Sequence, residues 1–239
     1  LLVGCSSGTA SSVPVSASSA AESTVSSVEE TASSAVDENE AAAAQLLNDL
    51  TGSYQELWPV ILADEYKQTW LDDCTALVGE DNAEAAFEKL SSMVTGDVYG
   101  EDAVKAYANG GGAYFCGFTN SLATLTFDGE TSTISGTDKD GNVLFSHAYH
   151  YIGMEPVRGL YEFESDDADS GEFTYFFLAP DTSVETYHIE FRYGSDAEAL
   201  SQYDAGEYAY WLASGISTDC DQTMIDNCIE LFCTENLAG

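Results

Sequence analysis

The stretch YHIEFRYGSD, from Tyr187 to Asp196, carries one of only three histidines in this chain of 239 residues. On a β-strand, side chains two positions apart point to the same face of the sheet. His188 and Glu190 would therefore project side by side. An imidazole next to a carboxylate indicates either half of a metal site or an ordinary polar pair on a solvated strand face.

Six segments between Ala113 and Pro180 have the same character, because they are short, aromatic and β-branched and are separated by turn residues. They read AYFCGFTNS, SLATLTFDG, TSTISGTDKDG, NVLFSHAYHYIG, RGLYEFESDD and GEFTYFFLAP. Asp140-Gly141 predicts a tight hairpin turn rather than a calcium loop, because the further calcium ligand positions are missing. Together with the opening stretch, these segments predict seven antiparallel strands in a meander that closes into a small barrel.

Helical spacing of apolar residues precedes and follows these strands. Residues 54–108 predict helices, with a kink or boundary at Pro59 and a C-cap at Gly79. The segment STDCDQTMIDNCIELFCTEN predicts a last helix, capped by Ser217 or Thr218. The expected fold class is mainly β with helices (α+β): an antiparallel β-barrel with N-terminal helices and a C-terminal helix.

The first residues predict a lipid anchor. Leu2-Val3-Gly4-Cys5 fits the bacterial lipobox, so residues 1–5 would be the remnant of a lipoprotein signal peptide, with Cys5 the lipidated residue. Residues 6–44 are rich in Ser and Ala and predict a disordered linker, although ENEAAAAQLLNDL favours a helix start at its end. The folded domain would cover residues 45–239 and be held outside the cytoplasm, on the bacterial cell membrane, by the lipid alone.

The charge balance argues against nucleic-acid binding. The chain has 6 Lys and Arg against 42 Asp and Glu, a formal net charge of -36. Such a surface repels phosphate backbones and anionic headgroups, and solubility alone is a sufficient reason for it. No apolar run reaches the ~18 residues that a membrane-spanning helix needs.

Neither the spacing of the cysteines nor a known catalytic motif indicates a specific site or reaction. Besides Cys5 there are five cysteines and no CxxC pair, which favours structural disulfides or buried thiols over a zinc ribbon. The sequence has no G-x-S-x-G elbow, Walker loop, Rossmann fingerprint or H-E-x-x-H helix. We therefore expect no enzyme activity.

Several segments occur in the order found in the ZinT (YodA) family of metal-binding proteins. GSYQELWPVIL resembles that family's opening G-x-W-Q-S-x-Y-P-x-L, and PVRGLYEFESDDADSGEFTY resembles its GVR-x-x-F-E strand, acidic turn and following strand. Leu178-Ala179-Pro180 resembles its I-A-P, residues 188–196 resemble its H-x-H-[IL]-[FY]-x-G-x-D, and residues 208–217 resemble its aromatic W-P-x-Y-Y-P stretch. The resemblance covers residues 48–235 and implies a calycin, lipocalin-like barrel.

The resemblance also implies a zinc site of three histidines near the barrel mouth. His188 falls on the first ligand position, Glu190 on the second and Phe176 on the third. One ligand would be kept, one replaced by another good zinc ligand and one lost.

A third ligand would have to come from elsewhere. His147 or His150 is expected to supply it; they lie three apart on one strand and face opposite ways, so at most one faces the lumen. Further options are Glu162, Glu164 and Glu185.

These inferences lead to one expected function and two alternatives. The expected function is binding of zinc or another divalent metal ion, as a buffer or as a donor to a metal uptake system. One alternative is a calycin barrel whose cavity takes a small organic ligand between Tyr and Phe side chains. The other is a surface interaction protein that has lost metal binding.

Overall fold

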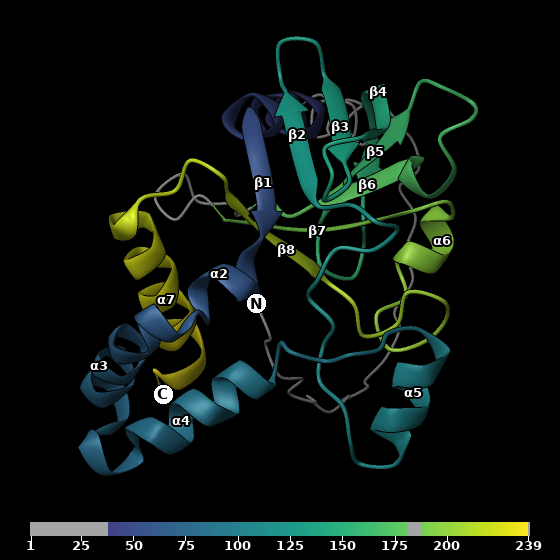
Figure 1. The fold of residues 1–239 in the computed structure, drawn as a ribbon. Helices are drawn as coiled ribbons and strands as arrows, with labels where there is room; N and C mark the ends of the chain where they lie inside the picture. The colour runs from purple at the N-terminus through teal and green to yellow at the C-terminus, as the bar shows by residue number, and fades with distance from the viewer. Residues whose placement is uncertain (1–37, 181–187, 239) are drawn as a thin grey trace, which may run out of the picture.

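The computed structural model describes residues 38–180 and 188–238, which form a β-barrel with helices packed outside it (Figure 1). A first helix covers residues 38–49. In chain order the further elements are β1 (Gly52–Glu56), α2 (Leu57–Ile61), η1 (Asp64–Tyr66), α3 (Lys67–Val78), α4 (Glu80–Ser92), α5 (Glu101–Ala108), β2 (Thr124–Asp128), β3 (Thr133–Thr137), β4 (Val143–Met154), β5 (Tyr161–Ser165), η2 (Gly171–Phe173), β6 (Tyr175–Leu178), β7 (His188–Gly194), α6 (Ala197–Leu200), β8 (Ala213–Ser217) and α7 (Gln222–Leu237).

The strands form a closed antiparallel barrel in the order β1 to β8, which confirms the predicted fold class. The strand that closes it, β1, was predicted to be helical, and that prediction was wrong. Tyr54 of β1 lies opposite Leu125 on one side and Ser217 on the other. Pairing on both edges satisfies backbone groups that would be exposed at an open edge, and this outweighs local helical spacing.

Two further strand predictions need correction. The segment at residues 113–121 forms isolated bridges rather than a strand, through the pairs Thr95–Phe115 and Phe115–Trp211. The eighth strand, β8, was not predicted as a strand. The last helix begins at Gln222, and the Asp221 side chain accepts a hydrogen bond from the Met224 N–H, so Asp221 is the cap in place of Ser217 or Thr218.

The hairpin between β3 and β4 and the helix end at Gly79 agree with the sequence. Asp138 accepts hydrogen bonds from the backbone N–H groups of Asp140 and Asn142, both at 2.9 Å. Gly141 has a φ of 82° and Gly79 one of 83°, values that suit glycine because it lacks a Cβ. The predicted turn and C-cap are therefore confirmed.

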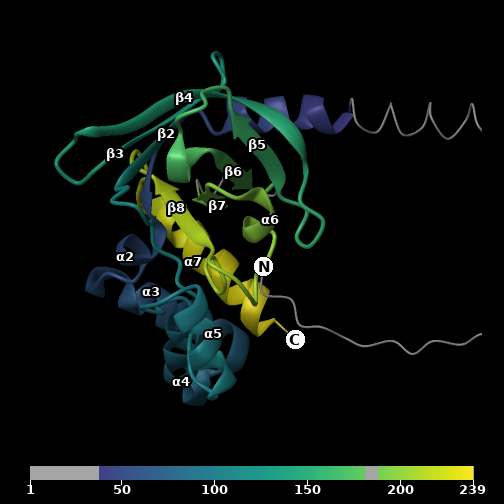
Figure 2. The same cartoon turned by 90° about the vertical axis from the view of Figure 1, so that its right-hand side faces the viewer.

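The helix over residues 38–49 lies toward the top of the barrel in Figure 1 and Figure 2, where its Asn48 packs against Gly129 of the β2–β3 turn. Ala43, Leu46 and Leu47 are buried in the same apolar cluster as the barrel interior. The folded part of the chain therefore begins before residue 45, the expected boundary. Residues 6–37 of the expected linker and the expected anchor Cys5 lie outside the described residues.

Two apolar cores meet at the barrel wall. The first fills the lumen with side chains such as Leu125, Phe163 and Phe176, each no more than 1% exposed. The second lies outside the wall, where α2, α3, α4 and α7 pack together around Trp70. Within residues 38–180 and 188–238, the helices are all too short or too polar to cross a membrane.

Candidate functional site

His188 and Glu190 line one pocket on the outer face of β7. Its wall also contains Trp58 from α2 and Cys228 and Glu235 from α7. The two side chains share a face, as strand alternation predicts. That face is turned toward the helices and not toward the barrel mouth, which corrects the expected orientation.

The inner face of β7 explains this orientation. Ile189, Phe191 and Tyr193 belong to the lumen cluster and are at most 1% exposed. A one-residue shift in register would place a carboxylate and an imidazole in that aromatic interior, at a cost of several kcal/mol per unpaired polar group. Cross-strand pairing fixes the register, because His188 lies opposite Ile216 and Glu190 opposite Ser214.

Two thiols lie near Glu190, and both are held neutral. Burial raises the pKa of Cys116 to about 12, and the negative charge of Glu190 adds to the increase. Burial and Glu190 likewise raise the pKa of Cys228 to about 12. Either sulfur could bind a metal ion only if the ion displaced its proton.

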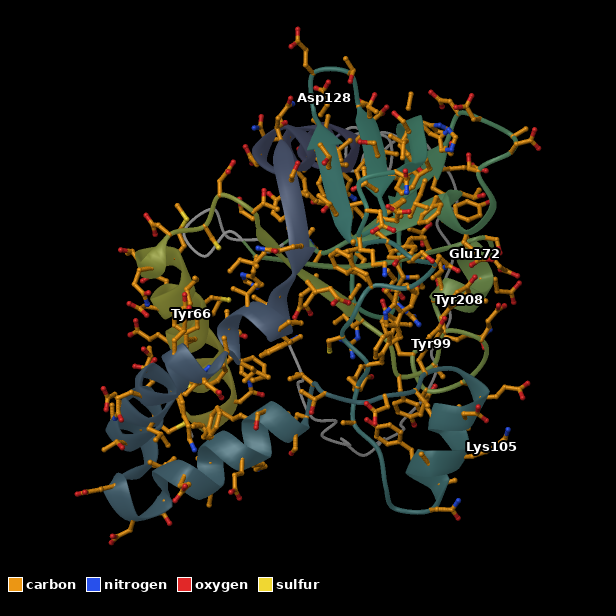
Figure 3. The ribbon with its side chains drawn as sticks, in the orientation of Figure 1. Tyr66, Tyr99, Lys105, Asp128, Glu172 and Tyr208 are labelled. Carbon is orange, nitrogen blue, oxygen red and sulfur yellow. The ribbon has the colours of Figure 1, made fainter. Side chains whose placement is uncertain are left out.

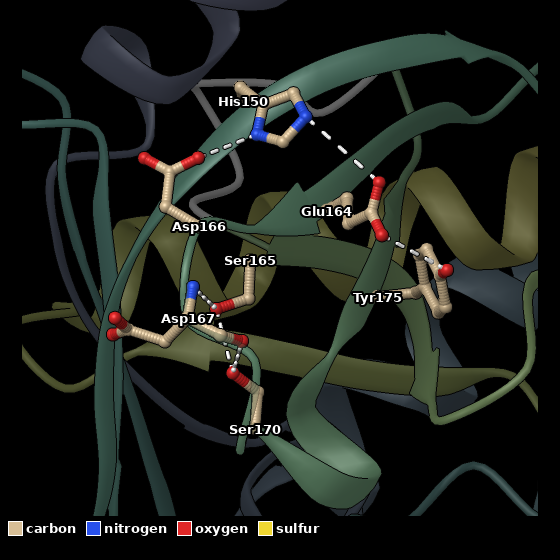
Figure 4. Close-up of polar contacts among 7 residues, drawn as sticks. All are labelled: His150, Glu164, Ser165, Asp166, Asp167, Ser170 and Tyr175. Carbon is tan, nitrogen blue, oxygen red and sulfur yellow. Dashed lines mark hydrogen bonds and ion pairs between the residues drawn. The ribbon is translucent and has the colours of Figure 1, made fainter.

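His147 and His150 do not join the β7 pair. They lie on opposite faces of β4, as expected, and strands β5 and β6 separate β4 from β7 around the barrel. His147 Nδ1 lies 2.7 Å from Asp167 Oδ2. His150 Nδ1 lies 2.7 Å from Asp166 Oδ1 (Figure 4).

The turn after β5 positions these carboxylates. Ser170 Oγ donates to Ser165 Oγ at 2.7 Å and contacts the Asp167 carbonyl oxygen at 2.8 Å, so the turn is internally bonded (Figure 4). Glu164 lies 4.0 Å from His150 Nε2 and accepts a hydrogen bond from the Tyr175 hydroxyl. The two β4 histidines are thus partners of carboxylates on the barrel surface.

The three-histidine zinc site of the ZinT family does not fit these residues. Phe176 pairs with Tyr193 and is fully buried inside the lumen, whereas His188 and Glu190 lie on the other side of the wall. The family's three ligand positions therefore do not converge. In residues 38–180 and 188–238, no group of three or more His, Cys, Asp or Glu side chains is arranged to hold a metal ion.

The remaining candidate ligands from the sequence do not complete the site. Glu162 lies on β5, and burial, together with the charge of Glu155, raises its pKa. Glu164 belongs to the His150 contact described above, and Glu185 lies outside the described residues. In this structure His188 and Glu190 are therefore a pair without a third carboxylate or imidazole from this set.

A cavity of about 310 Å³ lies on the other side of Trp58, and sequence reasoning missed it. Its wall combines Pro59 of α2 and Leu62, which follows that helix, with Val94, Phe115 and the Glu56 side chain at the end of β1. These residues come from segments far apart in the chain, and neither their spacing nor their types predict a cavity.

Cys116 and Trp58 both line this cavity, and both also line a smaller pocket that contains Glu190. Trp58 is 7% exposed, and its Nε1 is buried without a hydrogen-bond partner among residues 38–180 and 188–238. The Trp58 and Ser214 side chains act on the pKa of the Cys116 thiol, which places that thiol close to both. A thiol is a weak acceptor, so the indole N–H is poorly satisfied.

Both arginines of the chain gather at one ring beside this region. The guanidinium carbons of Arg158 and Arg192 lie 4.5 Å and 4.4 Å from the centroid of Tyr203. The Tyr203 hydroxyl donates to the buried carboxylate of Glu155 at 3.2 Å. Arg192 also donates to the carbonyl oxygens of Leu200 and Tyr208, so this network ties α6 and the following loop to β7.

The cysteines and the lumen bear on the other sequence expectations. The five cysteines that the structure describes are free thiols, with Cys74 Sγ and Cys233 Sγ 4.0 Å apart. The lumen holds stacked rings, with centroids 5.3 Å apart between Phe176 and Tyr193. A small organic ligand inside the barrel would have to displace these rings.

Comparisons with known proteins found matches among solved structures only. No family model matches the chain, and no curated protein matches it. The Zn(II)-bound ZinT-like domain of Streptococcus pneumoniae AdcA is similar in fold, with 16% identity over 77% of this chain and 89% of that chain and a TM-score of 0.48.

Zn(II)-bound AdcA from the same organism matches with 14% identity over 78% of this chain and a TM-score of 0.46. The chain spans 35% of the length of that protein. The ligands of this chain are therefore argued from its own residues.

Proposed function

We propose that this protein binds a divalent metal ion, zinc first, through His188 and Glu190 on the outer face of β7. The observation that carries the proposal is that an imidazole and a carboxylate share one strand face and one partly buried pocket. Both are good zinc ligands at ~2.0–2.2 Å. No reaction is part of the proposal.

Two protein ligands make a weak and exchangeable site. The remaining positions around the ion would be filled by water, or by the Cys228 thiol if the ion displaced its proton. Such a site releases its ion readily, which suits a buffer or a donor to a metal uptake system. Because protons compete for the imidazole, binding weakens as the pH becomes acidic.

The proposal includes the place where the protein works. We infer that Cys5 is lipidated and holds the domain on the outer side of the bacterial cell membrane, because Leu2-Val3-Gly4-Cys5 fits a lipobox. Mass spectrometry of membrane-extracted protein should find a diacylglyceryl group on Cys5. A mature protein that retains residues 1–4 would contradict the anchor and leave the metal site untouched.

The metal site is tested by zinc titration in a calorimeter with tag-free protein. His188→Ala and Glu190→Gln should each weaken zinc binding at least about tenfold, since even groups that only orient metal ligands are worth 10–100-fold. His147→Ala and His150→Ala are matched controls, because they remove the other two imidazoles from a different strand. They should leave the affinity unchanged.

Two results would overturn the proposal. One is a wild-type protein that takes up no zinc at millimolar concentration. The other is a loss of affinity in the β4 controls as large as that in the β7 variants, which would move the site to the carboxylate-rich turn after β5.

A further inference from the structure

We propose that the cavity beside Trp58 binds a small organic cation, an ammonium group on a flat apolar body. The cavity is separate from the pocket of His188 and Glu190, although Trp58 contributes to the walls of both. The inference stands independently of the proposed metal site. It rests on the size of the cavity, the nature of its walls and the sign of its charge.

The size of the cavity and the residues that line it favour a small ligand with an apolar group. A volume of about 310 Å³ is at the lower end of the range for ligand pockets in proteins. Pro59, Leu62 and Val94 provide apolar surface, while Trp58 and Phe115 provide two aromatic rings. A flat hydrocarbon group would contact these residues without leaving polar atoms unpaired.

The polar groups of the wall select a positive charge. Among the residues that the structure describes, Glu56 is the one carboxylate in this wall, and neither Lys nor Arg lines it. The Thr95 hydroxyl donates to the Ser91 carbonyl oxygen at 3.1 Å, so its oxygen lone pairs remain available to a donor. Acceptors and aromatic faces together recognise an ammonium group, because the face of an aromatic ring attracts a positive charge.

The backbone holds the carboxylate in place. Glu56 Oε1 accepts a hydrogen bond from the Phe118 N–H at 2.6 Å. A Cβ at Gly117 would lie 2.8 Å from that oxygen and 2.9 Å from Phe115 Cζ, so glycine at this position leaves room for the carboxylate. Glu56 is therefore fixed at the end of β1 rather than free to turn toward solvent.

The net charge of -36 adds a long-range attraction of the same sign. By itself that attraction would collect cations anywhere on the surface. The test must therefore separate recognition at Glu56 from diffuse accumulation.

The probe is 2-phenylethylammonium, and the readout is the indole N–H resonance of Trp58 in the folded wild-type protein, assigned with Trp58→Phe. The resonance should shift in a saturable manner. The neutral analogue 2-phenylethanol should bind at least about tenfold more weakly, and 3-phenylpropionate should not bind.

Variants locate the charge. Glu56→Gln keeps an oxygen for the Phe118 N–H and should reduce the affinity for the ammonium to that for the alcohol. Glu130→Gln is the control, because Glu130 is exposed in the β2–β3 turn, next to Asp128 at the far end of the barrel (Figure 3). It should bind the probe like wild type. His188→Ala should also bind it normally, whatever becomes of zinc.

Three results would overturn the inference. Equal affinity for the alcohol and the ammonium would show that charge plays no part. Equal weakening by Glu56→Gln and Glu130→Gln would reduce the effect to diffuse attraction. A Trp58 resonance that none of the three probes shifts would show that the cavity takes no ligand of this class.

Discussion

The two faces of β7 have opposite surroundings. The inner face presents Ile189, Phe191 and Tyr193 to a lumen filled with stacked rings. The outer face presents His188 and Glu190, both half-buried, to a layer of helices that leaves pockets between its side chains. One strand thus separates a region built for stability from a region with room for a ligand.

The difference indicates which side of the barrel wall has room for a ligand. The lumen is closed by packing, and a metal ligand there would need a polar group among aromatic rings. The outer face already carries polar side chains, and its contacts with α2 and α7 are incomplete. Substitutions on the inner face should therefore mainly lower the stability of the fold. Substitutions on the outer face should mainly weaken ligand binding.

The largest expected effect comes from placing a histidine at position 176, the third ligand position that the sequence resemblance implies. Phe176→His should lower the free energy of unfolding by about 3–5 kcal/mol, because it removes packed ring surface and buries an imidazole without partners. It should not increase zinc affinity, since position 176 lies across the wall from His188. Urea unfolding and zinc calorimetry measure both quantities. A variant that stayed stable and bound zinc more tightly would break the comparison of the two faces.

Trp58 tests the outer side of the wall. Trp58→Ala should cost about 2–3 kcal/mol, less than full burial of a large ring, because the ring borders two pockets. Trp58→Phe should cost less than about 1 kcal/mol, because it keeps a ring and removes an indole N–H that has no good partner. Chemical unfolding compares the pair. A larger cost for Trp58→Phe would mean that the indole N–H has a partner important for stability.

The smallest effect concerns the acidic contact between α3 and α7. Burial raises the pKa of Asp73, and the charges of Glu230 and Asp226 raise it further. A carboxylate whose pKa is raised in the folded state opposes folding at pH values above that pKa, and the opposition disappears as the pH falls through it.

Asp73→Asn should therefore stabilise the protein at neutral pH, by less than about 1 kcal/mol because the group is partly exposed. The variant and wild type should converge as the pH falls from the raised pKa of Asp73 to below its ordinary value of 3.8. Thermal unfolding at pH 7 and at pH 3 checks the sign. Glu88→Gln, on the exposed side of α4, is the control and should change little.

The sequence predicted the barrel and several of its turns because these follow local rules. Alternation in β4 and the Asp140-Gly141 turn depend on residues next to one another. It failed at β1, where Tyr54 and its neighbours have helical spacing but pair with two strands from distant parts of the chain. Closure of a barrel depends on pairing between distant segments, so no short stretch of the sequence predicts it.

The candidate site shows the same limit. The alternation of side chains on a strand correctly predicted that His188 and Glu190 share a face. Which face of the strand points into the lumen depends on the side chains that the other strands contribute to the barrel interior. The resemblance to three-histidine sites directed attention to Phe176, which lies on the opposite side. The Trp58 cavity forms only where three separate segments, residues 56–62, 94–96 and 115–117, come together in the fold.

The stacking of Arg158 and Arg192 on Tyr203 has a kinetic consequence. With both guanidinium groups held there, the basic groups left elsewhere are four lysines, since six basic residues include two arginines. A cation approaching from solution therefore meets an attractive potential over most of the surface. Its association rate should be high and should fall steeply as salt is added, while its dissociation rate changes little. Association of a cation with the protein would then be fast even where its affinity is low.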